Sequence, residues 1–595
     1  MKYIYSFLLS FMCFALAAQT PIAGGNVQGN WTLAGSPYQI QGVITVPYGQ
    51  TLTIQPGVEV VFQGLYHLYV NGMLDAEGTA NQPIVFRAQD TTGWYNDAMP
   101  QGGWRGIHFY YAPPNDSSQL KYCHIQDTKH GVQGNASIAA ALEGYRALHV
   151  SYCKIFHNQS TQNQSNGVIV GVYTFAAGEV FEIDHCELYD NYARVATLRT
   201  DNYIAGSSHI HHNSVHNNIG GCAVWALWCY LLLEENDIFE NEGTIDGSAV
   251  KLSVSRRSKI FRNKIHHNTC ETIGAVHCSA GKVDIDANLI CNNQHISGFC
   301  GATDGGGGIH VAHNDNAPFD STFYVIRNNV VANNYSSLAG GGVYVYNARV
   351  KIMNNHFINN TSVGGGTGMM RSIGAQSELD FQNNVFYGNA FPSPSTQEIQ
   401  IFEAAYLRFS YNWIESPRSQ RMTISLAVAT YGDTANNVIG INPMLIAPTL
   451  SNLLADDATI ANFNLAANSP CINAGNSDTT GCYVTPKDFL NNARLVARID
   501  IGAFEHKGAE GLFEFEGRNA SLHIFPNPAQ NNISLILPEK DGNMTLYNMM
   551  GEKVLETKAA STKMSWELPV LPAGMYLVIW EKNGKYVGDK LVIGE

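Results

Sequence analysis

The chain of 595 residues is poor in charge, since only 14% of its residues are Asp, Glu, Lys or Arg. It has no basic run and its formal net charge is −14, which argues against nucleic acid as a partner. Its 12 cysteines include no CxxC pair, so a structural zinc site is not expected. No segment after the N-terminus has the apolar length of a membrane span.

The N-terminal residues 1–18 contain one Lys, an apolar stretch from about Ile4 to Leu16, and small residues ending at Ala18. This pattern predicts a secretory signal with cleavage after Ala18. A signal anchor is the alternative, but the apolar stretch is short for one. We therefore expect an exported, soluble mature protein.

Eleven cysteines remain once Cys13 is removed with the signal. Their number is odd, so at least one must stay unpaired or pair between molecules. Cys471 and Cys482 flank a loop and are the candidate disulfide.

The composition is rich in Gly, with 56 residues, and in Tyr, with 29, as expected for β-structure with many turns. A motif, (Asn or Cys)-x-apolar-x-x-Asn, recurs at intervals of 23 to 41 residues, which predicts a solenoid. Short alternating runs such as "GVYVY" indicate that each unit is one turn of a β-coil, so that equivalent side chains stack. Inward Asn amides would then bond to the next coil, and Cys would fill the same place. The first positions of the motif are Cys123, Cys153, Cys186, Asn213, Asn236, Asn263, Asn288, Asn329, Asn355, Asn384, Asn412 and Asn437.

This pattern resembles the right-handed parallel β-helix of the pectate-lyase-like superfamily, including its stacked inward asparagines. The resemblance covers roughly residues 24–445 and implies an all-β fold with a β-helix over residues 19–445. Residues 446–508 resemble the closing segment at the end of many bacterial β-helix proteins. The signatures of polygalacturonases and pectate lyases are missing, so the fold assigns no activity.

Residues 509–520 are expected to be a linker, and residues 521–595 contain about seven short alternating stretches that predict a small β-sandwich. Phe525-Pro526-Asn527-Pro528, Leu546-Tyr547-Asn548 and Leu571–Tyr576 follow one another as in the C-terminal sorting domain of type IX secretion, which this region resembles. The resemblance implies the type IX machinery as a partner. It also implies passage through the outer membrane of a gram-negative bacterium, removal of the domain, and release or attachment at the surface.

In each coil, one strand is preceded by glycine, and we call it the glycine-led strand. Its outward residues recur with the coil period and should form one column, and we expect the functional side chains in this column. The column is basic and aromatic in an acidic chain, which suits an acidic extracellular polysaccharide. For a lyase, Lys251, His277 and His310 are the candidate catalytic residues, with Tyr344 as an alternative base. An ordinary solvated face explains the column equally well, and a non-catalytic adhesin or structural protein is the alternative function. The candidate binding residues are Tyr173, Arg199, Trp225, Tyr344 and Arg371.

Three acidic residues, Asp246, Glu271 and Asp304, precede strands of this column and would suit a general acid, a base or calcium ligands. Turn chemistry is the preferred explanation, since Gly follows Asp246 and Asp304. The histidines of "HIHHNSVHNN" invite a metal, but the repeat register places them at different points around the bend. The sequence therefore predicts no metal site and no evident cofactor, with calcium as the one alternative.

Overall fold

The computed structural model describes residues 19–96, 99, 101–110, 118–130, 139–144, 148–160, 167–172, 180–201, 206–243, 248–271, 273–296, 305–313, 322–363, 367–389, 397–415, 422–451, 453–476, 485–494, 498–506, 522–530, 532–537, 539–548, 553–582 and 585–594. The expected signal (1–18) and linker (509–520) lie outside these ranges. The chain divides into two compact units, Met1–His506 and Lys507–Glu595. The described part holds no helix of the length and apolarity that a membrane crossing requires.

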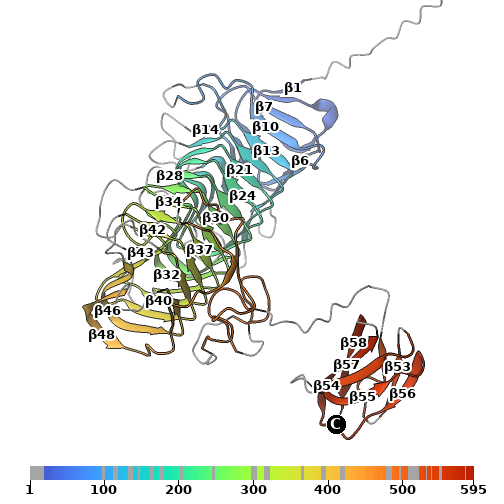
Figure 1. Cartoon of the computed structure of the whole chain (residues 1–595). Coiled ribbons are helices and arrows are strands. Elements are labelled where there is room, and N and C mark those ends of the chain that lie inside the picture. Colours follow the sequence, from blue (N-terminus) through green and yellow to red (C-terminus); the bar gives the residue numbers. More distant parts are fainter. Residues whose placement is uncertain are drawn as a thin grey trace, which may run out of the picture. The chain divides into compact units, whose positions relative to one another are not determined.

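The first unit is a parallel β-helix, which confirms the predicted fold (Figure 1). Each coil contributes strands to three faces, and every strand pairs in parallel with the equivalent strands of the coils before and after it. The strands of face 1 are β1 (Thr20–Ile22), β4 (Tyr38–Ile40), β7 (Glu59–Phe62), β10 (Ile84–Ala88), β13 (Cys123–Gln126), β17 (Lys154–Phe156), β21 (Glu187–Tyr189), β24 (Ser214–His216), β27 (Asp237–Phe239), β30 (Lys264–His266), β33 (Leu289–Cys291), β37 (Val330–Ala332), β41 (His356–Ile358), β45 (Val385–Tyr387), β47 (Trp413–Ile414) and β49 (Val438–Ile439). From β13 onward, each strand of face 1 begins at the first position of the motif or at the residue directly after it.

Face 2 carries the glycine-led strands, and face 3 carries the strands that lead back to face 1. In four coils, faces 2 and 3 are formed by one continuous strand, namely β29 (Val250–Phe261), β32 (Val276–Asp286), β46 (Gln397–Ser410) and β48 (Met422–Tyr431). The other main strands of face 2 are β19 (Gly167–Val172), β22 (Tyr192–Asp201), β25 (Ile219–Leu227), β35 (Ile309–Ala312), β39 (Val343–Tyr346) and β43 (Thr367–Ile373). Those of face 3 are β16 (Leu148–Ser151), β20 (Val180–Asp184), β23 (Ser207–His211), β26 (Tyr230–Glu234), β36 (Phe323–Arg327), β40 (Arg349–Met353) and β44 (Glu378–Gln382).

Two asparagine ladders run along the inside of the coil, as the motif predicts. Asn263 is typical: its amide donates to the Leu233 carbonyl at 2.9 Å and to the Asn288 side-chain oxygen at 3.0 Å. At the N-terminal levels cysteine takes this place, and the Cys123 backbone N–H points to the Cys153 sulfur at 3.3 Å. The ladders therefore satisfy the backbone groups that each turn removes from strand pairing.

The segment that follows β49 covers the side of the helix rather than only its end. It runs back along face 1, where Asn359 donates to the Thr449 carbonyl and Asn333 to that of Ser451, both at 2.9 Å. Asn292, one level further back, donates to the Leu454 carbonyl at 2.9 Å. An apolar cluster lies beneath, formed by Cys291, Val330, Ala332, Ile358, Val385 and Trp413 of face 1 with Ala458, Phe463, Leu465, Cys471, Ile501, Ala503 and Phe504.

Cys471 is a buried free thiol, so the candidate disulfide with Cys482 is not formed; Cys482 itself lies outside the described residues.

The second unit contains two antiparallel sheets, as expected for a β-sandwich. One sheet consists of β52 (His523–Phe525), β53 (Asn532–Ile536) and β56 (Lys563–Glu567). The other consists of β54 (Asn543–Asn548), β55 (Lys553–Lys558), β57 (Gly574–Lys582) and β58 (Lys585–Ile593), and the two share one core around Leu546, Trp566 and Leu591. Asn527 ties the Phe525–Pro528 motif to the last strand, since its side chain accepts from the Val592 N–H at 2.8 Å.

Candidate functional site

Strand pairing brings seven of the eight predicted column residues into one row on face 2. The row is Arg199, Trp225, Lys251, His277, His310, Tyr344 and Arg371. Tyr173 lies outside the described residues, and Val170 is the residue opposite Arg199. The repeat period therefore predicted the register correctly from Arg199 onward.

Most of this column is buried. His277 is 6% exposed, His310 2% and Tyr344 1%. The His310 ring nitrogen Nδ1 lies 3.0 Å from the Gly305 carbonyl, and the Gly305–Gly306 backbone approaches the Tyr344 ring. Burial lowers the pKa of His277 well below its usual value and that of His310 to about 4, so both imidazoles are neutral near pH 7. A polymer at the surface does not reach these rings in this structure, and their catalytic role stays a prediction.

The cationic side chains of the column already contact a carboxylate or aromatic rings within the protein. Arg199 donates through Nε and Nη2 to both oxygens of Asp201, at 3.0 and 2.7 Å, in a bidentate pair. Its guanidinium lies 4.4 Å from the Trp225 ring centroid, and the Lys251 ammonium lies 4.9 Å from that centroid. The Arg371 guanidinium lies 4.8 Å from the Phe402 ring centroid. The column thus resembles a stack that stabilises the face, and Arg199 has its carboxylate partner within the protein.

An open groove with a volume of about 1220 Å³ lies on face 3. We call it the basic groove, and it extends across β20, β23, β26, β29, β32, β36 and β40. Six coil steps of about 4.8 Å make it roughly 29 Å long along the helix axis. Its lining residues are Val180, Ser207, Ser208, His209, Tyr230, Leu231, Leu232, Arg257, Ser258, Lys259, Lys282, Asp284, Phe323, Arg327 and Arg349.

Positive charge dominates this groove. Arg327 lies 3.3 Å from Asp284 and 3.1 Å from Asp286, the latter also contacting Lys259 at 3.6 Å. Arg349 is paired with Glu378 at 3.0 Å. Five cations therefore meet three carboxylates, a surplus of two. Within the described residues, the exposed side chains of Arg257 and Lys282 have no ion-pair partner.

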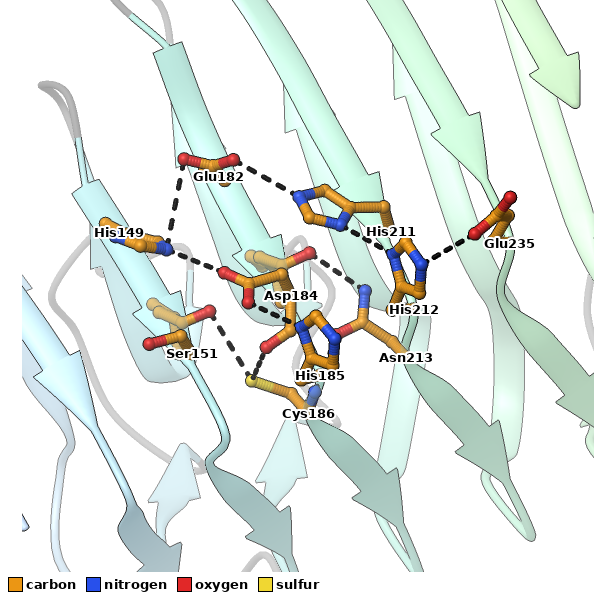
Figure 2. A network of polar contacts seen from close by, with 12 residues as sticks. His149, Ser151, Glu182, Asp184, His185, Cys186, His211, His212, Asn213 and Glu235 are labelled. Atoms are coloured by element: carbon orange, nitrogen blue, oxygen red, sulfur yellow. Dashed lines mark hydrogen bonds and ion pairs between the residues drawn. The ribbon is translucent and has the colours of Figure 1, made fainter. Parts of the chain in front are cut away.

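A cluster of histidines and carboxylates lies on the same face, beside the N-terminal end of the groove (Figure 2). His149 lies 2.6 Å from Asp184, whose other oxygen contacts His185 at 2.8 Å. These contacts explain the lowered pKa of Asp184, which burial opposes and the two histidines favour. Two residue groups in this cluster have donor atoms close enough to hold one metal ion: Glu182 with His209 and His211, and His149 with Glu182 and Asp184.

The prediction that the register separates the four histidines of "HIHHNSVHNN" is wrong for two of them. His209 and His211 are two apart on β23, so both point outward from face 3, and their ring centroids lie 4.0 Å apart. His212 lies in the following bend, and His216 is on face 1 beside Glu187 at 3.4 Å. The spacing His-x-His on a strand was the signal for the pair.

The acidic residues weighed as calcium ligands do not form a site within the described structure. Glu271 is exposed in a bend, while Asp246 and Asp304 lie outside the described residues. Seven residues that stand four positions after the first position of the motif occupy left-handed turn positions with φ between 50 and 64°. They are Asp127, His157, Asp190, Asn217, Glu240, His267 and Asn292.

Comparison with known proteins places one part of the chain in a family. Residues 523–594 match the secretion system C-terminal sorting domain. A stretch of 110 residues is 32% identical to Protein bark beetle of Drosophila melanogaster, covering 18% of this chain and 4% of that protein.

Among solved structures, the enzymatically active domain of tailspike protein 2 of bacteriophage CBA120 aligns over 93% of this chain and 72% of that one, with 10% identity and a TM-score of 0.18. Full-length tailspike protein 2, from an Escherichia coli O157:H7 bacteriophage, aligns over 96% of this chain and 64% of that one, with 9% identity and a TM-score of 0.17. Scores this low carry no conclusion about function. The family match, in contrast, supports a conclusion. This β-helix chain ends in a type IX secretion sorting domain, which marks it for secretion or for the cell surface.

Proposed function

We propose that the exported protein binds an acidic polysaccharide lengthwise in the basic groove of face 3. The observation that carries the proposal is the surplus of cations there, in a chain whose net charge is −14. Arg257 and Lys282 are exposed cations in the groove, able to bind the carboxylate or sulfate groups of a polymer. Tyr230 and Phe323 add aromatic surface on which sugar rings can pack.

This assignment moves the binding surface away from the column on face 2. The groove is open and unfilled by protein, whereas His277, His310 and Tyr344 are buried. Binding, rather than cleavage, is the function proposed here. A lyase would need a base beside the bound polymer, and the column's candidate bases do not line this groove.

The test compares a groove variant with a matched control in the full-length chain. Arg257→Ala with Lys282→Ala should weaken binding to polyuronate or sulfated glycans roughly 10- to 100-fold, at about 1 kcal/mol or more for each charge-assisted contact. Lys154→Ala with Lys264→Ala removes the same charge from exposed positions on face 1 and should leave the affinity unchanged. Surface plasmon resonance at low and high salt measures both, and added salt should weaken wild-type binding.

Two outcomes would refute the proposal. One is a wild-type chain that binds no acidic polymer of the panel, which would leave a structural surface role. The other is an equal loss of affinity in the two double variants, because binding would then depend on the overall charge of the protein and not on the groove.

A further inference from the structure

The cluster beside the basic groove contains three side chains whose donor atoms converge on one point. Glu182 Oε1 lies 3.2 Å from a nitrogen of His211, Nε2, and 3.6 Å from a nitrogen of His209, Nδ1. All three donor atoms lie within 4.8 Å of one another. The three side chains are only partly exposed, with 35% of Glu182, 28% of His209 and 15% of His211 accessible.

These separations match a tetrahedral metal site. A metal bound at about 2.0–2.1 Å by nitrogen and oxygen ligands holds its donors roughly 3.3 Å apart. The pairs at 3.2 and 3.6 Å lie close to this value, so small side-chain movements would complete the geometry. Two imidazoles with one carboxylate suit zinc and its neighbours among the divalent transition metals, while calcium prefers oxygen alone.

Hydrogen bonds on the far side of each ring orient the donors toward that point. His209 Nε2 lies 2.8 Å from Glu234, so this nitrogen carries the proton and the lone pair of Nδ1 is left on the side of Glu182 Oε1. Histidine ligands of metals are usually held in this way by a carboxylate that accepts from the other nitrogen.

His211 is oriented by a longer relay, visible in Figure 2. His212 Nε2 lies 2.6 Å from Glu235 and donates to it, which leaves His212 Nδ1 as an acceptor. The His211 Nδ1–H then donates to His212 Nδ1 at 2.9 Å, and the lone pair of His211 Nε2 faces Glu182. With these tautomers, two imidazole lone pairs and a carboxylate oxygen face one another, an arrangement that a cation stabilises.

The neighbouring group of His149, Glu182 and Asp184 is a poorer site. Asp184 already accepts from His149 at 2.6 Å and from His185 at 2.8 Å, so both of its oxygens are engaged. His149 Nε2 lies 3.9 Å from Glu182 and points at Asp184 instead. The hydrogen bonds of this group are complete without an ion.

We propose that Glu182, His209 and His211 bind one divalent transition metal ion, zinc in the first instance, and leave a fourth position open. Three protein ligands with an open position are the arrangement in which zinc binds water or a substrate oxygen. His209 also lines the basic groove, so an oxygen ligand from a bound polymer could take that position. The metal site itself does not depend on the proposed glycan binding.

Metal titration of the full-length chain, purified without a histidine tag and freed of metal by a chelator, tests the proposal. Calorimetry with ZnCl₂ should show one ion per chain, and Co²⁺ should give the strong visible absorption of a tetrahedral complex. His211→Ala and His209→Ala should each weaken binding at least about 100-fold, and the conservative Glu234→Gln about 10- to 100-fold. Circular dichroism confirms that each variant keeps its β-structure.

Two histidine variants serve as controls. His216→Ala removes a histidine that is paired with a glutamate on face 1, and His149→Ala disrupts the neighbouring group; both should keep the wild-type affinity. Saturable binding that survives His211→Ala overturns the proposal, as does a wild-type chain that takes up no ion. Loss on His149→Ala with no loss on His211→Ala would place the ion in the other group and would equally overturn it.

Discussion

Asn218 offers the sharpest test of how the β-helix is stabilised. Its side chain is 3% exposed and belongs to the second asparagine ladder. The amide donates to the carbonyls of Leu188 at 2.9 Å and His216 at 3.0 Å, and to Asn241 Oδ1 at 2.9 Å. Its oxygen accepts from the backbone and side chain of Asn191, at 3.1 and 2.9 Å.

The change Asn218→Ala removes all five of these bonds and leaves buried backbone groups without partners. At about 1 kcal/mol for each bond, with added desolvation cost and partial rescue by water, we expect a loss of roughly 3–5 kcal/mol. Unfolding entropy is about 2.1 cal/mol/K for each residue, so a cooperative unit of about 400 residues gives nearly 1 kcal/mol/K. The melting temperature should therefore fall by about 4–6 °C.

Differential scanning calorimetry of the full-length chain measures this shift, with Asn217→Gly as the control in the same turn. Asn217 is exposed at φ 53°, a conformation that glycine adopts freely, so its replacement should change stability by no more than about 0.5 kcal/mol. Equal shifts in the two variants, or a shift below 1 °C for Asn218→Ala, would refute the view that the ladders stabilise the coil.

Two further predictions concern face 2 and the segment along face 1. Trp225→Ala with Lys251→Ala should change affinity for acidic glycans less than about twofold, because binding is assigned to the basic groove; a tenfold loss in the same plasmon resonance assay would return the site to the column. Burial and the nearby Arg494 lower the pKa of His356 to about 3, and His356 Nδ1 accepts from the Ala503 N–H at 2.7 Å. The unfolded chain, with a histidine pKa near 6.5, binds a proton that the folded state excludes, so stability should fall as pH drops below about 6.5. His356→Gln should make guanidinium midpoints less dependent on pH between 7 and 4.5, and an unchanged slope would contradict this account.

Several features could be predicted because they repeat or form an ordered set of motifs. The Asn ladder could be predicted because the motif places Asn at the same position of successive coils. The row from Arg199 to Arg371 could be predicted from the coil period. The sorting domain was predicted from its short motifs in order, and the family match over residues 523–594 confirms it.

Burial and the grouping of side chains could not be predicted in the same way. His277 and His310 stand in the predicted row, yet they are buried, because neighbouring rings of the row and the Gly305 backbone pack against them. The basic groove combines residues from seven coils, and its surplus charge depends on which cations pair with carboxylates. The bonds that Asn292, Asn333 and Asn359 make to the returning segment could not be predicted either, because their partners lie more than 85 positions away in the chain.

The sequence by itself determined the architecture of this protein: a stacked β-coil with inward asparagines, followed by an export domain. Periodicity is enough for the coil, since each unit repeats the same local contacts, and an ordered set of short motifs is enough for the export domain. Only the tertiary structure decided which face is open, which charges lack partners, and that Glu182, His209 and His211 converge. These depend on side chains of neighbouring coils meeting across strands about 4.8 Å apart, a proximity that is set by register and chain path rather than by any local motif.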